Sequence, residues 1–384
     1  MTPFARSASA TLALLSALLL VERAHPSVAP AFVPRWLQGQ VRECVYHGLN
    51  EEDELGLLAG YYTELLDASR EATRGGDLDQ VWERALHRGA IHERLDSFLL
   101  YRPKPSHGDA KDPASFHVTN AAGLFDRDYP DARTPGVRRI VWVGDSLSRG
   151  LGAPFGEALE PRVEAWLDEG RGDGRGAAGG VEVLNLAVEG YRLTQFMKVV
   201  DLALPRWRPD VVLVGLSDLS VARIWGHHLA CLVHDGIDLE YPFLREIVAR
   251  ARLERDDPPR VADGKLAPFR AEFVRTALAT IQASCAAAGV ELVVALLPAV
   301  GESERLVQRF REAREACAAL GLRQIDLVDT FAGVDDLADW RVSDIDHHPN
   351  VAGYERLFES FAAALERDPA TYELLAGRPL PARR

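Results

Sequence analysis

Five short apolar runs, separated by stretches with helical periodicity, constrain the fold of this chain more than any other feature. All five follow Gly136: RRIVWVGDS, VEVLNLAV, PDVVLVGLS, ELVVALLPAV and LRQIDLVDTF. Near-continuous apolar runs are typical of strands buried on both faces, and their alternation with helices requires a parallel sheet covered on both sides. The sequence therefore predicts an α/β fold, a three-layer α/β/α sandwich around a five-stranded parallel sheet.

The amino-terminal segment, residues 1–31, has the composition of a targeting sequence. Arg6 precedes an uncharged run over 7–21, which Glu22 ends. A positive start and an apolar stretch of this length are typical of a signal peptide. An Ala-x-Ala site stands only at 29–31, so an uncleaved membrane anchor and an ordinary helix stay open. We expect an extracytoplasmic protein that is secreted, periplasmic or attached to a membrane.

The remaining segments surround the alternating region. Residues 32–135 are expected to form a helical amino-terminal extension, with helical periodicity over 51–76 and near 79–100. The main domain is predicted over 136–368, and 369–384 form a carboxy-terminal tail. An insertion at about 219–265 interrupts the alternation after the third strand, so we expect it to cap the crevice at the strand ends.

Charge and cysteine spacing exclude several classes of protein. The formal net charge is −13, from 57 acidic and 44 basic residues, and this sign disfavours nucleic acid as a partner. The four cysteines form no CxxC pair, so zinc-ribbon and dithiol redox sites are not expected. The adjacent His227 and His228 lack metal-ligand spacing, and we expect neither a metal site nor a cofactor.

Three polar blocks follow the first three predicted strands, where the ligand crevice of a parallel sheet lies. Ser146 stands in a Gly-Asp-Ser-Leu turn as a candidate nucleophile, Gly190 can offer its backbone N–H, and Ser217 precedes Asp218. Taken alone, each block is equally compatible with a helix cap or a turn glycine.

A fourth block, Asp344-Ile345-Asp346-His347-His348-Pro349-Asn350, precedes the last long helical stretch. Histidine is the side chain suited to take a proton from serine near neutral pH. A carboxylate must orient the imidazole and stabilise its charged form. Asp346, two residues before His348, can share the same loop and reach it.

Together the four blocks, in this order, resemble the GDSL (SGNH) hydrolase family of esterases and acyltransferases, over about residues 138–364. The resemblance implies a flavodoxin-like sheet and a catalytic Ser146. It also implies that His348 is the general base and Asp346 its orienting acid. The backbone N–H groups of Ser146 and Gly190 would then form the oxyanion hole, with the Ser217 hydroxyl as a third donor.

Two departures from the family pattern concern this site. The third block of the family usually reads Gly-x-Asn-Asp, and Ser217 replaces the asparagine that donates to the oxyanion; losing one such donor costs ~10²–10³ in rate. The commoner Asp-x-x-His spacing is met by Asp344 and His347, our fallback acid and base. Only His348 is followed by Pro-Asn, so we prefer Asp346 and His348.

These observations predict a cofactor-independent serine esterase that acts on a small-molecule, glycan or lipid ester. Two alternatives stay open: an extracytoplasmic carbohydrate O-acyltransferase that uses the same acyl-enzyme, and a non-catalytic glycan-binding relative.

Overall fold

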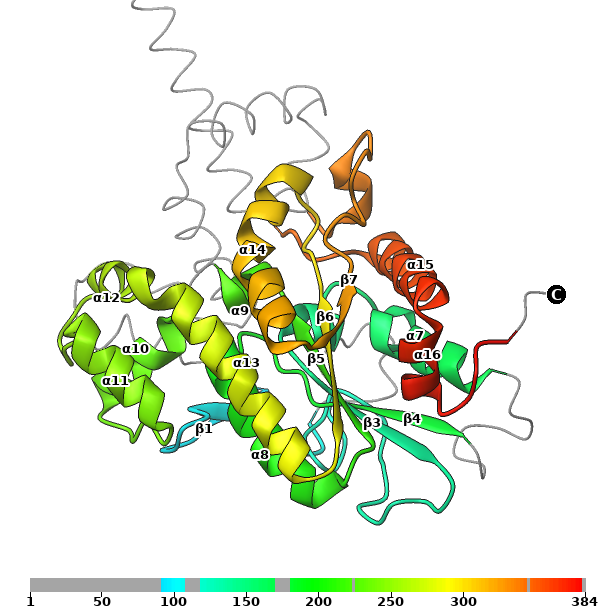
Figure 1. The fold of residues 1–384 in the computed structure, drawn as a ribbon, viewed down its shortest axis with the longest axis horizontal. Coiled ribbons are helices and arrows are strands. Elements are labelled where there is room, and N and C mark those ends of the chain that lie inside the picture. Colours follow the sequence, from blue (N-terminus) through cyan, green and yellow to red (C-terminus); the bar gives the residue numbers. More distant parts are fainter. Residues whose placement is uncertain (1–90, 108–117, 170–179, 223–224, 344–345, 382–384) are drawn as a thin grey trace, which may run out of the picture. The chain divides into compact units, whose positions relative to one another are not determined.

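The computed structural model describes residues 91–107, 118–169, 180–222, 225–343 and 346–381 (Figure 1). All of them lie within the second of the two compact units of the chain, residues 62–384. The predicted targeting segment, 1–31, and the predicted helix over 51–76 lie outside the described residues. Among the residues that are described, no helix has the length and apolarity needed to span a membrane.

A five-stranded, entirely parallel sheet forms the centre of the fold, as the apolar runs predict. Its strand order is β4-β3-β5-β6-β7. The strands are β3 (Arg138–Val143), β4 (Val181–Asn185), β5 (Val211–Leu216), β6 (Glu291–Leu296) and β7 (Arg323–Asp326). Because β4 and β5 flank β3 on opposite sides, the chain reverses direction across the sheet beside β3, which is where ligands bind in such sheets.

Two layers of helices cover the sheet, on the left and the right in Figure 1. Alternate strand residues point to opposite layers, so Val141 and Val143 join one apolar cluster while Ile140 and Trp142 join the other. The first layer contains α8 (Leu193–Trp207), α13 (Arg270–Ala287) and α14 (Ser303–Leu320). The second contains α7 (Leu159–Asp168), α15 (Val351–Arg367) and α16 (Pro369–Ala376). The predicted three-layer sandwich is confirmed.

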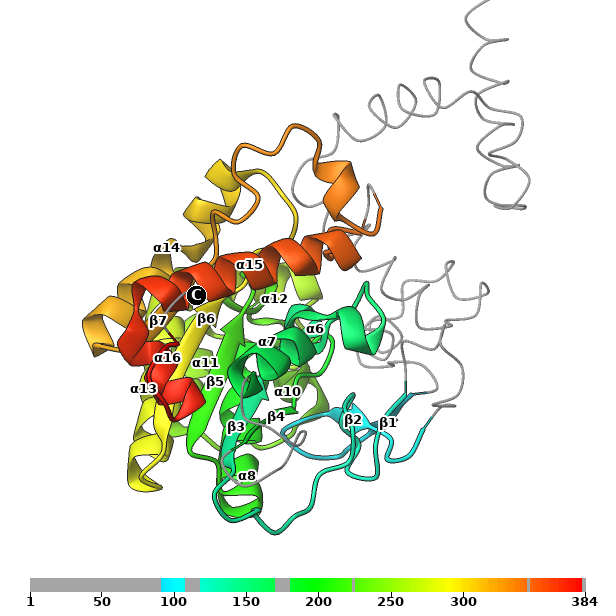
Figure 2. The same ribbon diagram turned by 90° about the vertical axis from the view of Figure 1, so that its right-hand side faces the viewer.

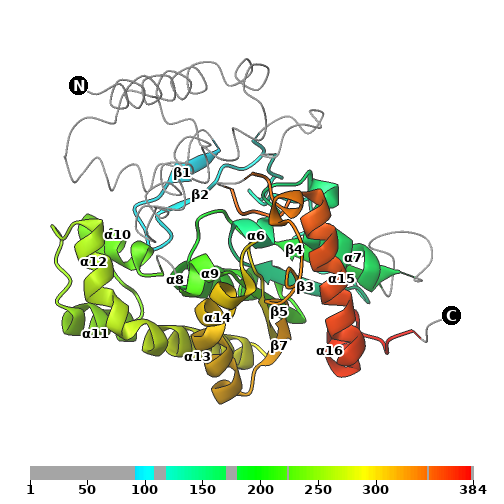
Figure 3. The same ribbon diagram turned by 90° about the horizontal axis from the view of Figure 1, so that it is seen from above.

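The segment after β5 is helical. It contains α9 (Asp218–Val221), α10 (His227–Asp235), α11 (Pro242–Ala251), α12 (Pro259–Leu266) and the 3-10 turn η2 (Ala267–Phe269). Helix α10 packs against α8, and α11 packs against α13. Figure 3 shows α10, α11 and α12 grouped at one flank of the sheet. The insertion therefore forms a side wall next to the strand ends.

Within the described part of the amino-terminal extension, residues 92–103 form a hairpin instead of the predicted helix. Strands β1 (His92–Arg94) and β2 (Tyr101–Pro103) pair antiparallel beside the loop that follows β4 (Figure 2). The prediction of a helix near 79–100 is wrong over 91–100. Phe98, Leu100 and Tyr101 are buried in the core cluster around α8, and this tertiary packing overrides the helical propensity of the segment.

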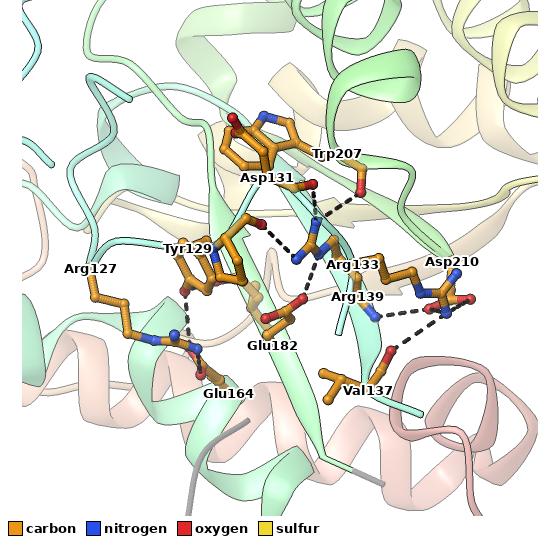
Figure 4. Close-up of polar contacts among 12 residues, drawn as sticks. Arg127, Tyr129, Asp131, Arg133, Val137, Arg139, Glu164, Glu182, Trp207 and Asp210 are labelled. Atoms are coloured by element: carbon orange, nitrogen blue, oxygen red, sulfur yellow. Dashed lines mark hydrogen bonds and ion pairs between the residues drawn. The ribbon is translucent and has the colours of Figure 1, made fainter. Parts of the chain in front are cut away.

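Residues 127–137, which we call the strap, connect the hairpin to β3 and are fixed by charged side chains (Figure 4). The fully buried Arg139 binds Glu182 at 2.5 Å and donates to the Pro130 carbonyl at 3.1 Å. Arg133 donates to both carboxylate oxygens of Asp210 at 2.6 Å. The extension is therefore built into the main domain at this point.

Two shorter turns and the chain end complete the fold. The 3-10 turns η1 (Phe155–Glu157) and η3 (Leu337–Trp340) flank α7 and α15. The predicted tail from 369 is not a free extension, since α16 buries Tyr372, Leu375 and Ala376 in the second core cluster.

Candidate active site

Ser146 follows the carboxyl end of β3, the second strand of the sheet, as the first residue of the short helix α6 (Ser146–Arg149). Asp145 caps this helix, because its carboxylate accepts the Leu147 N–H at 3.1 Å. The N–H of a first helical residue has no acceptor within its own helix. The turn thus presents a serine hydroxyl and a backbone donor at the same point of the crevice.

A chain of hydrogen bonds connects Ser146 to the loop before α15. The Ser146 Oγ lies 2.8 Å from His348 Nε2, and His348 Nδ1 lies 2.5 Å from Asp346 Oδ1. An ionised carboxylate only accepts, so Nδ1 carries the proton and Nε2 accepts from the serine hydroxyl. All three side chains are buried. This is the arrangement in which an imidazole can take the serine proton.

The loop that carries His348 is fixed by backbone contacts. Val342 N–H donates to the His348 carbonyl at 3.0 Å, and Asn350 caps α15 by accepting the Gly353 N–H at 3.0 Å. The Tyr354 hydroxyl donates to the Leu151 carbonyl, just beyond α6, at 3.0 Å. Base and nucleophile are thus held together by contacts outside the triad.

Gly152 allows the two segments to approach closely. It adopts a positive φ of +106°, and a Cβ there would overlap the Pro349 carbonyl oxygen and lie 2.8 Å from a methyl group of Val342. The glycine is required both by the backbone conformation and by the proximity of the His348 loop.

The fallback pair is not assembled in the described residues. Asp344 lies outside them, and the bond to Ser146 is made by His348. The backbone carbonyl of His347 accepts the Val300 N–H at 2.9 Å. The structure therefore brings together the preferred acid and base, Asp346 and His348.

The loop containing Gly190 lies against the Ser146 turn. Val188 N–H donates to the Gly144 carbonyl at 3.1 Å, and the buried Glu189 carboxylate lies 3.4 Å from the Arg149 guanidinium. Gly190 itself has a positive φ of 77°. The hydrogen bond and the ion pair thus connect the Gly190 loop to the segment that carries Ser146.

The hydroxyl of Ser217, the third predicted oxyanion donor, is bonded to the residue that caps α6. This hydroxyl donates to Asp145 Oδ2 in a short hydrogen bond and accepts the Ser220 N–H at 3.3 Å. A hydroxyl can donate only one hydrogen bond, and here the Ser217 hydroxyl donates it to the Asp145 carboxylate. In this structure the Ser217 hydroxyl therefore holds the cap of α6.

Arg192 is a site residue that sequence reasoning missed. It is buried at the amino end of α8, and its charge interacts with Asp145 and with Asp263 of α12. Burial raises the pKa of Asp145, which the Ser217 hydrogen bond and Arg192 oppose. Burial likewise raises the pKa of Asp263 to about 6. One feature of the sequence could have indicated Arg192 as a site residue: it stands two residues after Gly190, at a strand-to-helix turn, where ligands bind in parallel sheets.

The described residues contain no group of three or more potential metal ligands. The imidazole of His228 lies 2.7 Å from the Phe98 carbonyl and 2.8 Å from the Thr194 hydroxyl. Because a carbonyl only accepts, Nε2 carries the proton and Nδ1 accepts from threonine. Burial lowers the pKa of His228 to about 3, which keeps the ring neutral and structural.

The sheet and the site together define a class. A parallel sheet of this order, with a serine after its first strand in sequence and an Asp-x-His loop before the last long helix, is the flavodoxin-like arrangement that the resemblance to the GDSL (SGNH) family implies. The resemblance inferred from the four sequence blocks is thus confirmed at the level of the fold.

No family model and no curated protein sequence matches the chain. Solved structures of similar fold include a lipase/acylhydrolase from Enterococcus faecalis, at 18% identity, TM-score 0.38, with 64% of this chain and 100% of that chain covered. The esterase EstA from Pseudoalteromonas sp. has 14% identity, TM-score 0.38 and coverage of 60% and 97%. A catalytic mutant of the acetylxylan esterase Axe2 from Geobacillus stearothermophilus has 12% identity, TM-score 0.40 and coverage of 61% and 96%.

Proposed function

We propose that this chain is a serine esterase that cleaves a carboxylic ester through an acyl-enzyme on Ser146. The observation that carries the proposal is the continuous chain of hydrogen bonds from Ser146 through His348 to Asp346, at 2.8 and 2.5 Å. A serine activated by a base, with the base oriented by a third group, is the general signature of nucleophilic catalysis.

The two half-reactions follow from these bonds. Ser146 Oγ attacks the ester carbonyl carbon while its proton moves to His348 Nε2. The tetrahedral intermediate then collapses, the C–O bond to the alcohol breaks, and His348 returns the proton to the departing oxygen. Water repeats the sequence on the acyl-enzyme and releases the acid. The Asp346 carboxylate stabilises the imidazolium in both steps.

The oxyanion that forms on the carbonyl oxygen needs donors aimed at it. We assign this role to the backbone N–H of Ser146 and the N–H of Gly190. Since the Ser217 hydroxyl is bonded to Asp145, the proposed hole has two backbone donors and no side-chain donor from the third block.

For the substrate we propose a small-molecule, glycan or lipid ester, and for the location we propose the extracytoplasmic side of the membrane. The location rests on the sequence of residues 1–31 alone. An acceptor other than water at the deacylation step would make the same site an O-acyltransferase.

The test is hydrolysis of p-nitrophenyl acetate, butyrate and octanoate by the full chain, beside Ser146→Ala and His348→Ala. We expect each single variant to lose nearly as much activity as the double variant, because a triad acts as a unit. A fluorophosphonate should label the wild type and leave Ser146→Ala unlabelled. Labelling of both proteins, or near-additive losses, would refute the assignment. Acylated sugar products would favour the transferase.

A further inference from the structure

We propose that Tyr101, on the β1–β2 hairpin, is a positioning residue that orients the Gly190 N–H in the oxyanion hole. The inference rests on the proposed function. It assigns a part in the reaction to the amino-terminal extension, which the four sequence blocks do not include.

The phenol of Tyr101 is bonded to the peptide that contains the proposed donor. Its hydroxyl donates to the Glu189 carbonyl oxygen at 3.0 Å in a buried hydrogen bond. The carbonyl of residue 189 and the N–H of residue 190 belong to one planar trans peptide and point in opposite directions. A bond that fixes the carbonyl therefore also fixes the direction of the N–H.

This peptide needs an external restraint because of the residue that follows it. Glycine occupies both positive and negative φ readily, so the backbone at Gly190, with φ 77°, selects no single orientation by itself. The side chain of Glu189 is held separately, 3.4 Å from Arg149 and 3.6 Å from His92. Glu189 is therefore held both by its side chain and by its backbone carbonyl.

The hydroxyl of Tyr101 is itself rigidly placed. Its side chain is 3% exposed, and its ring packs edge-to-face on Tyr191 with centroids 5.1 Å apart. The hydroxyl of Tyr191 donates in return to the Tyr101 carbonyl at 2.6 Å. Gln195 of α8 donates to the Leu99 carbonyl at 2.8 Å. The hairpin thus sits in a fixed register against the loop that contains Gly190.

A donor on the carbonyl has a second effect on the same peptide. Hydrogen bonds in a chain polarise one another, so a bond to the C=O strengthens the N–H as a donor. The orientation and the polarisation of the Gly190 N–H both stabilise the negative charge that develops on the carbonyl oxygen in the transition state. They change the binding of the uncharged ester little.

The experiment compares Tyr101→Phe with the wild type in p-nitrophenyl ester hydrolysis and in the rate of fluorophosphonate labelling. Phenylalanine keeps the ring and removes only the hydroxyl. We expect kcat and the labelling rate to fall about tenfold to a hundredfold, less than the ~10²–10³ caused by removing a donor outright. KM should stay unchanged. The labelling rate gives a readout that does not depend on knowing the substrate.

Tyr129→Phe is the matched control. Tyr129, in the strap (Figure 4), also donates its hydroxyl to a backbone carbonyl, that of Val183 in β4 at 2.6 Å. Both variants lose one hydroxyl-to-carbonyl bond, so both should melt at a lower temperature. Only Tyr101→Phe should lose kcat when both are assayed well below their melting temperatures.

The outcomes separate the inference from the function on which it rests. Turnover that depends on Ser146 but is equal in Tyr101→Phe and Tyr129→Phe overturns the role of Tyr101 alone. A fall in kcat that is equal in the two variants, or a rise in KM in place of a fall in kcat, also overturns it. The absence of any Ser146-dependent turnover or labelling overturns the proposed function together with the inference.

Discussion

The hydroxyl of Ser217 and the carboxylate of Asp145 share a buried hydrogen bond, one residue before the proposed nucleophile. The other carboxylate oxygen of Asp145 accepts the Leu147 N–H and caps α6. Ser217 therefore acts on Ser146 through the helix cap. This relationship replaces the direct role in the oxyanion hole that the sequence pattern suggests.

Removing this hydroxyl should affect both stability and catalysis. In Ser217→Ala the buried Asp145 carboxylate loses a donor, which costs about 1–3 kcal/mol of unfolding free energy. A less firmly capped α6 misplaces Ser146, and kcat should fall by about tenfold to a hundredfold. Denaturant unfolding and ester hydrolysis measure the two effects.

Thr371→Val provides the control for this variant. The Thr371 hydroxyl donates at 2.5 Å to Asp368, which caps α16, so the same kind of bond occurs far from Ser146 in the sequence and on another helix. Thr371→Val should keep its kcat and lose less stability than Ser217→Ala, because the exposed Asp368 carboxylate can still bind water. A parallel fall of kcat in both variants would mean that the loss reports general loosening of the fold.

The acid of the triad can be identified by comparing two carboxylates of the same loop sequence, Asp344 and Asp346. Asp346→Asn removes the charge that stabilises the His348 imidazolium, and kcat should fall by about 10³–10⁴. Asp344→Asn, in the fallback position, should leave kcat close to that of the wild type. The reverse order of effects would assign the acid to Asp344.

The close approach at Gly152 makes a steric prediction. A methyl group in Gly152→Ala meets Pro349 and Val342, so the loop must shift. Overpacking of this kind costs about 1–3 kcal/mol, and a displaced His348 should lower kcat by about a hundredfold. Gly236→Ala also places an alanine at a positive φ, +70°, but with nothing within 4 Å of the added methyl group. It should lose stability alone, and an equal loss of kcat there would contradict the steric explanation.

The burial of His228 predicts an acid-dependent loss of stability. The folded-state pKa of about 3 lies below the ordinary value of 6.5, so between these values the unfolded chain binds the additional proton. Stability from this group is present above pH 6.5 and declines as the pH falls toward 3. At pH 5 the loss is about 2 kcal/mol, from 1.5 pH units at 1.36 kcal/mol each.

His228→Gln removes the titrating group and tests this account. The unfolding free energy of wild type and variant, measured between pH 8 and pH 4, should differ most at pH 8 and converge on acidification. A constant difference over this range would show that the imidazole does not control the pH dependence.

The sheet and the triad could be predicted because their signals are local in sequence. Each strand is a continuous apolar run, and Ser146, Asp346 and His348 stand in short blocks at the ends of such runs. Buried parallel strands leave this pattern regardless of which residues their neighbours are.

The hairpin and the role of Ser217 could not be predicted because both depend on partners distant in sequence. Residues 91–100 have helical periodicity, but Phe98 and Leu100 are buried by α8 and its neighbours. The hydroxyl of Ser217 finds Asp145, 72 positions away. No spacing rule connects such pairs, since only the folded sheet brings the ends of β3 and β5 together.

The buried Arg139 makes the start of the sheet depend on residues that precede it. Its guanidinium donates to the carbonyls of Pro130 and Trp207, so an excised fragment beginning at 136 would leave a buried cation without one of its acceptors. The smallest piece of this chain that unfolds cooperatively therefore includes the strap and begins before Pro130. A truncation designed on the motif boundaries alone would cut through a single thermodynamic unit.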